Sequence, residues 1–185
     1  MPYLCSLARW TDHRDYTILR ALAFDFPEDP NVHDLKDQYL SGPALMVCPV
    51  THPMYYDQGS TLLHGIPRTR PVYLPARIDW YDFWAGRRYA GGQTIEAAAP
   101  LDILPLFVRA GSILPLGPVV QHTEEQLDAE WEIRVYPGAD GAFDVYEDAG
   151  GGLGYQTGHM HGLRCAGPMS TADFGLNGAK ATSRG

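Results

Sequence analysis

The sequence lacks any run of lysine or arginine and any long apolar stretch. Its 14 basic residues face 22 acidic ones, and the formal net charge is −8, so no basic patch is expected that could neutralise a phosphate backbone or an anionic membrane surface. Apolar stretches such as Ile103 to Val108 are far short of the roughly 20 residues that a membrane-spanning helix needs. These absences predict a soluble chain that binds neither nucleic acid nor a membrane.

Cysteine is scarce, and its spacing gives no paired motif. Cys5, Cys48 and Cys165 are far apart and none belongs to a CxxC pair, so neither a disulfide framework nor a zinc site is predicted. The first residues, MPYLCSLARWTDHRD, have no basic start followed by an apolar core and a small-residue cleavage site. No secretory signal is therefore predicted in this chain, and its compartment stays open.

Short elements are expected throughout, because 15 prolines and 20 glycines interrupt the 185 residues. Apolar residues between Tyr3 and Trp10 are spaced as on one face of a helix. Two apolar segments follow, Thr17 to Phe26 and Ala44 to Val50, and each is typical of a strand that is buried on both faces. This order of elements indicates that residues 1–50 are the end of an α/β barrel. Outside a barrel, such strands would expose apolar faces and associate with other chains.

From Pro71 onward, glycine or proline separates short strand-like segments at close intervals. This spacing is typical of an antiparallel β-sandwich, which we place at residues 51–125. The segments WEIRVYP and AFDVYED are joined by the turn residues Gly138 to Gly141. They predict a hairpin that opens a second sandwich over residues 126–157. Residues 158–185 show neither a helical nor a strand period.

Seven segments of the chain resemble consecutive blocks of glycoside hydrolase family 31, and most of all those of its α-xylosidases. They follow one another in the order and with the spacing of the family over residues 1–157. A single matching block would be suggestive, whereas a whole series in order is not expected by chance. The segments are MPYLCSLA, RALAFDFPEDP, DQYLSGPALMVCPV, VYLP, WYDFWAGRRYAGGQ, APLDILPLFVRAGSILPLGP and RVYPGADGAFDVYEDAG.

The resemblance implies a mainly β fold, a C-terminal β-sandwich preceded by the last strands and a helix of a truncated (β/α)8 barrel. Residues 1–50 would end the catalytic barrel, residues 51–125 would form the proximal C-terminal sandwich, and residues 126–157 would begin the distal one. Met1 matches an interior position of family members, which suggests a start assigned inside a longer gene. Residues 158–185 do not continue the family pattern, so a shifted reading frame is expected there.

Family members hydrolyse glycosidic bonds with retention of configuration, which takes two carboxyl groups about 5 Å apart. In the family, both catalytic aspartates and the groups that bind the sugar lie upstream of the block that begins here at Met1. The resemblance therefore implies the C-terminal part of a retaining α-glycosidase. The full-length hydrolase would remove terminal α-linked xylose or glucose from oligosaccharides. No residue of this chain inherits a catalytic, substrate-binding, metal or cofactor role, so the chain alone is expected to be inactive.

Two other functions stay open. A stand-alone carbohydrate-binding or structural β-sandwich module would need no barrel strands, so residues 1–50 weigh against it. A complementing subunit would pair with a separately encoded catalytic half that carries the two aspartates, which this chain would then be missing.

Two acidic clusters invite a functional interpretation. Asp25, Glu28 and Asp29 follow a predicted barrel strand, where the catalytic groups of barrel enzymes lie. Acidic loops bounded by prolines are nevertheless more often solvated turns. Glu147 and Asp148 suggest a cation site, although a hard cation needs six or more oxygens and few are near in sequence. The structural interpretation is favoured for both clusters.

Histidine and aromatic residues offer two further candidates. The pair His159 and His161 hints weakly at a metal site. A run of aromatic residues is compatible with a platform for stacking sugars, but core packing is preferred because the rings alternate on both faces of the predicted strand. The run comprises Trp80, Tyr81, Phe83 and Trp84. The other histidines lack the spacing of metal ligands, and surface or hydrogen-bonded roles are expected for His13, His33, His52, His64 and His122.

The gene itself tests the expected frameshift in the tail. One permitted back-translation of GHMHGLRCAGPM, read one nucleotide earlier, gives Ala-Tyr-Ala-Arg-Ile-Ala-Leu-Arg-Trp, which alternates as a strand does. We expect the earlier frame of the nucleotide sequence to be open and to encode such an alternating segment. Stop codons in that frame would contradict the frameshift.

Overall fold

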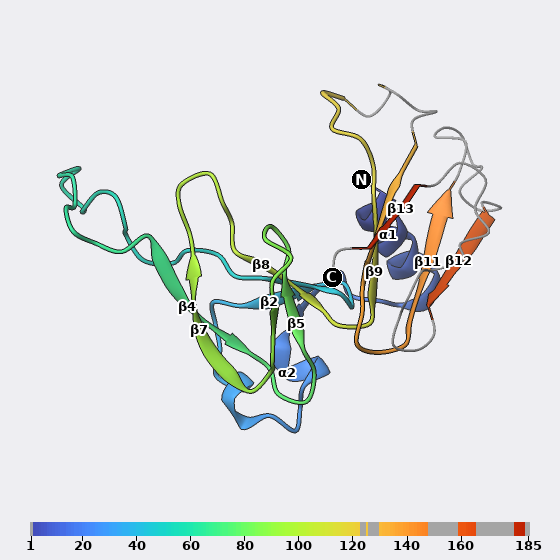
Figure 1. Cartoon of the computed structure of the whole chain (residues 1–185), viewed down its shortest axis with the longest axis horizontal. Coiled ribbons are helices and arrows are strands. Elements are labelled where there is room, and N and C mark those ends of the chain that lie inside the picture. Colours follow the sequence, from blue (N-terminus) through green and yellow to red (C-terminus); the bar gives the residue numbers. More distant parts are fainter. Residues whose placement is uncertain (1, 123–124, 126–129, 148–158, 166–179, 184–185) are drawn as a thin grey trace. The chain divides into compact units, whose positions relative to one another are not determined.

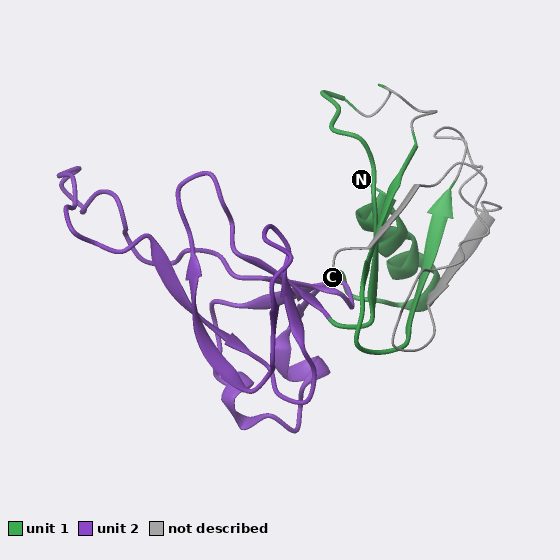
Figure 2. Ribbon diagram, in the orientation of Figure 1, with its two compact units in different colours: residues 1–18, 110–185 green, residues 19–109 purple. Residues whose placement is uncertain are grey.

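The chain divides into two compact units. The computed structural model describes residues 2–122, 125, 130–147, 159–165 and 180–183 (Figure 1). The central unit is Leu19–Arg109, and the terminal unit combines Met1–Ile18 with Ala110–Gly185 (Figure 2). No helix among these described residues is long and apolar enough to cross a membrane.

The central unit is a β-sandwich in which every strand pair is antiparallel. Its larger sheet has the strand order β1-β2-β3-β8-β5-β6, and β4 pairs with β7 in the smaller sheet. Two short helical turns, α2 (Leu22–Asp25) and η1 (Pro30–Val32), interrupt the strands. The strands are β1 (Leu19–Ala21), β2 (Tyr39–Ser41), β3 (Leu45–Val47), β4 (Thr69–Leu74), β5 (Trp80–Asp82), β6 (Arg88–Tyr89), β7 (Gln93–Ala98) and β8 (Leu106–Arg109).

The core of the central unit joins its two sheets and draws on both halves of its sequence. Leu40 in β2 and Met46 in β3 are fully buried, as are Leu74 in β4 and Phe107 in β8. The segment before residue 50 and the strands after residue 68 therefore share one core. The other buried members are Leu22, Phe26, Val32, Cys48, Val72, Trp80 and Ala97.

The strand predicted at Thr17 to Phe26 is wrong for most of its length. Only β1 is extended there, and α2 takes up the next four residues. Leu22 and Phe26 are buried, whereas Leu19 and Phe24 are 59% and 74% exposed. Burial four positions apart is the period of a helical turn, so this segment is not a strand covered on both faces.

The strand predicted at Ala44 to Val50 is confirmed only for its first half, where Leu45–Val47 form β3. This strand pairs antiparallel with β2 and with β8, whereas the strands of a (β/α)8 barrel are parallel. The mainly β fold is therefore confirmed and the barrel end is not. It stays a prediction that residues 1–50 close a barrel in a longer chain and that the sandwich segments 51–125 and 126–157 follow it.

Helix α1 (Pro2–Arg14) packs against strands in the terminal unit, as the apolar spacing of its residues predicts. The rings of Tyr3 and Trp10 have centroids 5.1 and 4.9 Å from that of Phe143 in β11. Buried Ser6 accepts a hydrogen bond from the Tyr146 N–H at 3.0 Å. The strands of this unit are β9 (Ser112–Leu116), β10 (Glu132–Tyr136), β11 (Gly141–Glu147), β12 (His159–Cys165) and β13 (Lys180–Ser183).

The hairpin predicted for the segments WEIRVYP and AFDVYED is wrong, because its two strands belong to different sheets. β10 lies between β9 and β13, and β11 pairs with β12 instead. The turn between β10 and β11 passes close to the start of β9, where a Cβ added to Gly141 would lie 1.9 Å from the Gly111 carbonyl oxygen. With both edges of β10 occupied, the chain crosses to the other sheet.

The tail contains two strands where none is predicted. β12 pairs antiparallel with β11, with Cys165 opposite Gly141 and His159 opposite Glu147, and β13 pairs with β10. A ladder uses main-chain groups, so it forms here without an alternating sequence. The prediction of a tail without strands is wrong for these segments. The rest of residues 158–185 lies outside the described residues, and the frameshift stays a prediction.

Truncating Leu40 tests whether the segment before residue 50 shares the core of the central unit. Leu40→Ala and Leu74→Ala should each lower the free energy of unfolding by about 2 to 5 kcal/mol, because both side chains are fully buried. Leu62→Ala is the control. It should cost less than about 1 kcal/mol, since Leu62 is 47% exposed. Urea unfolding followed by tryptophan fluorescence measures all three, and a Leu40→Ala variant as stable as the wild type would contradict a shared core.

Candidate functional site

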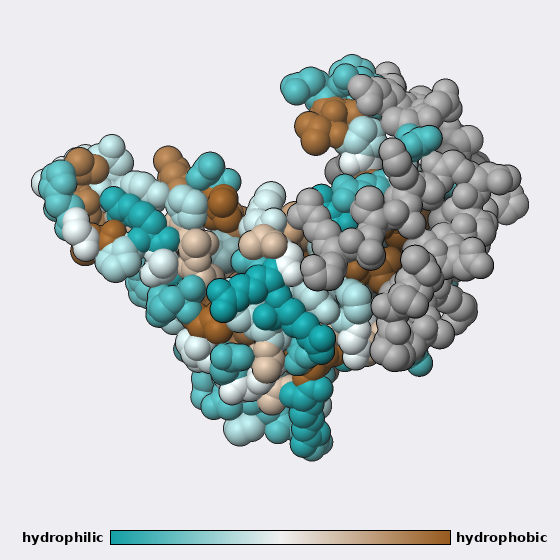
Figure 3. Space-filling view, in the orientation of Figure 1, coloured by the Kyte–Doolittle hydropathy of each residue, from teal (hydrophilic) through white to brown (hydrophobic). Residues whose placement is uncertain are grey.

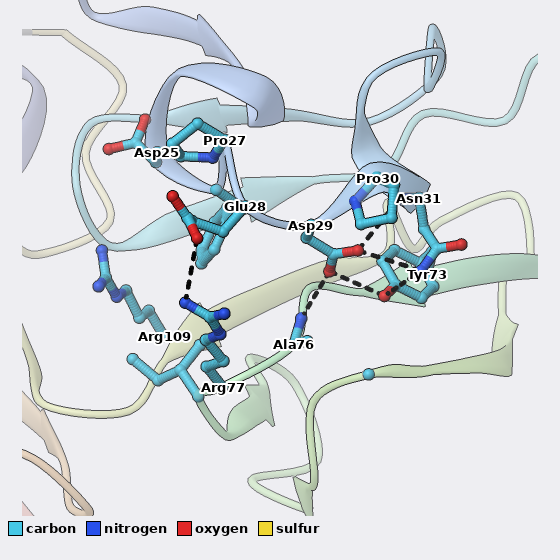
Figure 4. Close-up of a pocket in the computed structure, with 13 residues that line it drawn as sticks. Asp25, Pro27, Glu28, Asp29, Pro30, Asn31, Tyr73, Ala76, Arg77 and Arg109 are labelled. Carbon is cyan, nitrogen blue, oxygen red and sulfur yellow. Dashed lines mark hydrogen bonds and ion pairs between the residues drawn. The ribbon is translucent and has the colours of Figure 1, made fainter.

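The acidic loop singled out in the sequence lines a cleft of the central unit. This acidic cleft measures about 510 Å³ and is bounded by residues 25–31, by the β4–β5 connection and by Arg109 at the end of β8 (Figure 4). Asp25, Glu28 and Asp29 all lie on its wall. The structure therefore brings the three predicted acidic residues to one place.

Four hydrogen bonds hold Asp29 in this cleft. Its Oδ1 accepts from the N–H and from the side-chain amide of Asn31, both at 3.1 Å. Its Oδ2 accepts from the Tyr73 hydroxyl at 2.8 Å and from the Ala76 N–H at 2.9 Å (Figure 4). Because Asp29 is only 8% exposed, it is a buried anion whose two oxygens are both satisfied.

These bonds fix the charge of Asp29. Burial acts to raise the pKa of a carboxyl group, because it penalises the charged form. Hydrogen bonds from Ala76, Tyr73 and Asn31 outweigh this effect, and the pKa of Asp29 is lowered from its ordinary value. Burial and the bond to Asp29 raise the pKa of Tyr73. At neutral pH the pair is therefore an ionised carboxylate and a protonated hydroxyl.

Local sequence explains why Asp29 occupies this position. It caps η1, and Pro30 fills the start of the turn. Aspartate followed by proline is a common start of a helical turn, because the carboxylate accepts a free N–H and proline supplies a preset φ. That signal is readable in the letters DPN. The partners Tyr73 and Ala76 lie 44 and 47 residues further along the chain, and no local pattern marks them.

The other two acidic residues are paired with arginines. Asp25 Oδ2 lies 2.8 Å from Arg20 Nε, in a pair that is half-buried. Glu28 lies 3.8 Å from Arg77, and both side chains are mostly exposed, so this pair contributes little to stability.

This arrangement favours an anchoring role over proton transfer. A general acid in glycoside hydrolysis needs a raised pKa, and the pKa of Asp29 is shifted in the opposite direction. The guanidinium of Arg109 lies 5.5 Å from the centroid of the Phe26 ring and adds a cation to the wall. Tyr73 and Arg109 are the members that the sequence pattern misses, because tertiary packing brings them to the loop.

The other acidic pair and the histidine pair lie in or beside β11 and β12. Glu147 ends β11, and Asp148 lies outside the described residues. His159 and His161 fall on β12. Across the described part of the chain, no three histidine, cysteine, aspartate or glutamate side chains are arranged to hold a metal ion.

The remaining histidines lie at the surface, as expected. His13 is 2.9 Å from an Arg9 guanidinium nitrogen, and His33 Nε2 is 2.9 Å from the Pro27 carbonyl oxygen. The side chains of His52, His64 and His122 are also exposed.

The aromatic run divides between core and surface. Trp80 and Tyr81 are 0% and 3% exposed, as core packing predicts, and Phe83 is half-buried. The prediction is wrong for Trp84, which is 48% exposed. Its ring stands edge-on to Phe83, and its indole N–H donates to the Leu104 carbonyl at 2.8 Å. Trp84 is thus hydrogen-bonded to the loop between β7 and β8.

Cys48 belongs to the core of the central unit. Burial raises the pKa of its thiol to about 12, with Arg70 opposing the shift and Asp37 adding to it. A thiol that stays protonated at neutral pH is a poor nucleophile, so Cys48 is a packing residue.

The chain is similar to known glycoside hydrolases over most of its length. Residues 15–114 match the family model of the glycosyl hydrolase family 31 C-terminal domain. The α-xylosidase of Saccharolobus solfataricus is 41% identical over 87% of this chain and 20% of its own length. The α-glucosidase of Aspergillus oryzae is 34% identical over 72% of this chain and 13% of its own.

Solved structures agree with these relatives. The crystal structure of the α-xylosidase from Xanthomonas citri is 47% identical with a TM-score of 0.78, over 89% of this chain and 17% of that one. The chain thus spans no more than 20% of the length of these proteins.

Asp29→Asn tests the anchoring role. It should lower the free energy of unfolding by about 2 kcal/mol at neutral pH, because the new amide nitrogen would face another donor and leave it unsatisfied. The folded-state pKa of Asp29 is lowered, so its contribution is complete above the unfolded carboxyl pKa of about 4. That contribution is lost as pH falls through the folded value. Urea unfolding of D29N and wild type at neutral pH and in acid should therefore show a smaller difference in acid.

Glu28→Gln provides the matched control. Glu28 is adjacent in sequence but mostly exposed, so this substitution should change the unfolding free energy by less than about 0.5 kcal/mol at either pH. A difference between D29N and wild type that is the same at both pH values would contradict an electrostatic origin.

Proposed function

The chain belongs to glycosyl hydrolase family 31, and we propose that it is the C-terminal part of a retaining α-glycosidase that removes terminal α-linked xylose or glucose from oligosaccharides. One observation carries the proposal. The matched residues 15–114 correspond to the C-terminal domain of the family, while the whole chain accounts for only 20% of the α-xylosidase from Saccharolobus solfataricus.

The relatives support an α-linked sugar as the substrate. The chain is 41% and 47% identical to two α-xylosidases and 34% identical to an α-glucosidase. The higher identities support xylose more than glucose. Family membership supports the hydrolase class, and the retaining route is what that membership implies.

In this proposal the chain supplies supporting structure, and the rest of the enzyme supplies the chemistry. Retention needs two carboxyl groups about 5 Å apart, one of which acts first as an acid. Asp29 is held ionised by four donors, and Asp25 is engaged with Arg20. Both therefore favour structural roles, and the catalytic aspartates would lie in the part of the enzyme that this chain does not span.

A chimera tests the proposal directly. In it, this chain replaces the matching segment of the Xanthomonas citri α-xylosidase. The chimera should hydrolyse an aryl α-xyloside at a rate within about tenfold of the parent enzyme, while the parent with that segment deleted should be inactive. The chain by itself should turn over neither an aryl α-xyloside nor an aryl α-glucoside, because nucleophile and acid are both missing.

Two results would count against the proposal. One is a folded but inactive chimera. The other is turnover by the isolated chain that Asp25→Asn or Asp29→Asn abolishes, since it would place the chemistry in the acidic cleft.

A further inference from the structure

The acidic cleft also holds charged groups outside the Tyr73 hydrogen-bond network. Its side away from Tyr73 is lined by Asp25, Glu28, Arg77 and Arg109 (Figure 4). Figure 3 shows mainly hydrophilic surface with small apolar patches at the end of the central unit that carries α2. Carboxylates and guanidinium groups thus line one volume of about 510 Å³, and ligand pockets typically measure roughly 300 to 1,000 Å³.

The Arg109 guanidinium offers hydrogen-bond donors to this cleft. Its side chain is half-buried, and among the described residues its guanidinium has only a ring contact, 5.5 Å from the Phe26 centroid. The main-chain N–H of Arg109 donates to the Ala44 carbonyl at 2.9 Å, which holds the base of the side chain in place. A guanidinium carries five N–H donors in a planar fork, so the cleft contains donors that a ligand would satisfy.

Glu28 adds acceptors beside these donors. Its carboxylate lies 3.8 Å from an Arg77 nitrogen, which is longer than a hydrogen bond. A hydroxyl group between the two would donate to Glu28 and accept from Arg77. The loops that carry both residues are held by the bonds from Asn31 and Ala76 to Asp29, so binding would order little of the main chain.

The charges on the walls determine which kind of ligand fits. An anion attracted by the two guanidinium groups would also meet Glu28 and the ionised Asp29, and like charges repel. A cation would meet the same conflict with the opposite sign. A neutral ligand with several hydroxyl groups avoids it, because a hydroxyl donates to a carboxylate and accepts from a guanidinium. Phe26, Pro27 and Ile78 add apolar surface for the C–H face of such a ligand.

We propose that the acidic cleft is a saccharide-binding site, because a sugar ring combines a rim of hydroxyl groups with a C–H face. That the sugar carries α-linked xylose or glucose rests on the proposed function. Arg77 and Arg109 would donate to the sugar hydroxyls, and Glu28 would accept from them. Asp29 would act as a positioning residue, since its two oxygens are already occupied.

Titration of the full chain with an α-xylosyl-glucose disaccharide, followed by heteronuclear NMR, tests the proposal. We expect saturable shifts of the amide signals of Glu28, Arg77 and their neighbours. Arg109→Met should weaken binding at least about fivefold, because it removes the donors and keeps an apolar stem. Arg87→Met is the matched control: its guanidinium also lies near a ring, 4.9 Å from the Tyr89 centroid, but outside the cleft. Its dissociation constant should stay within about twofold of the wild type.

Glu28→Ala gives a second test that does not depend on a half-buried side chain. The Glu28 side chain is 73% exposed, so the variant should fold as the wild type does. It should also weaken binding of the disaccharide about fivefold, since the hydroxyl groups lose their acceptor. Wild-type affinity in this variant would contradict the proposed contacts.

The outcomes separate the saccharide site from the proposed function. A cleft without saturable shifts, or an Arg109→Met variant that binds as the wild type does, overturns the site even if the chimera is active. Inorganic phosphate that shifts the same signals at lower concentration than the disaccharide would assign the cleft to an anion, which also overturns it. Arg109-dependent binding of the disaccharide by a chain whose chimera is inactive upholds the site and removes the proposed function.

Discussion

The free edge of β4 is the constraint on which the central unit depends. β4 pairs with β7 on one side only, so the main-chain groups on its other side need partners from elsewhere. Gln38, which is 4% exposed, supplies them for Tyr73. Its Nε2 donates to the Tyr73 carbonyl at 2.8 Å, and its Oε1 accepts from the Tyr73 N–H at 2.9 Å. An unsatisfied buried group costs about 1 to 3 kcal/mol. The sandwich therefore requires the segment before residue 50 to lie along β4.

Two buried charges strengthen the same connection. Arg70, only 5% exposed, donates to the carbonyls of Asp37 and Pro49 and pairs with the Asp37 carboxylate at 2.8 Å. Asp29 accepts a hydrogen bond from the hydroxyl of Tyr73 in the same strand. A buried charge is tolerated when it is paired or well hydrogen-bonded. Arg70 is paired with Asp37, and Asp29 accepts four hydrogen bonds. Asp29, one of the three acidic residues that invite a catalytic interpretation in the sequence, is thus accounted for by the need to fasten one segment to a strand edge.

The sequence predicts the features that local residue patterns encode, and it misses those that depend on which strands pair with each other. The mainly β character, β3 and the burial of Trp80 follow from apolar runs punctuated by glycine and proline. Thr17 to Phe26 is mispredicted because an apolar run does not distinguish a strand from a helical turn. The hairpin prediction fails because β10 finds partners in β9 and β13, which no local signal reveals. The acidic cleft is predictable only in part: its DPN turn is local, while Tyr73 comes from 44 residues away.

The shared core also decides where apolar surface is left uncovered. The apolar runs before residue 50 suggest that this part of the chain would be exposed without a barrel. Leu40 and Met46 are nevertheless 0% exposed, because they pack between the two sheets. Exposed apolar side chains of the central unit include Phe24 in α2 (74%) and Leu101 in the β7–β8 loop (84%). At about 25 cal/mol per Å², covering such side chains would be favourable. A closed core whose strands satisfy one another is the arrangement expected of a supporting sandwich in the proposed enzyme.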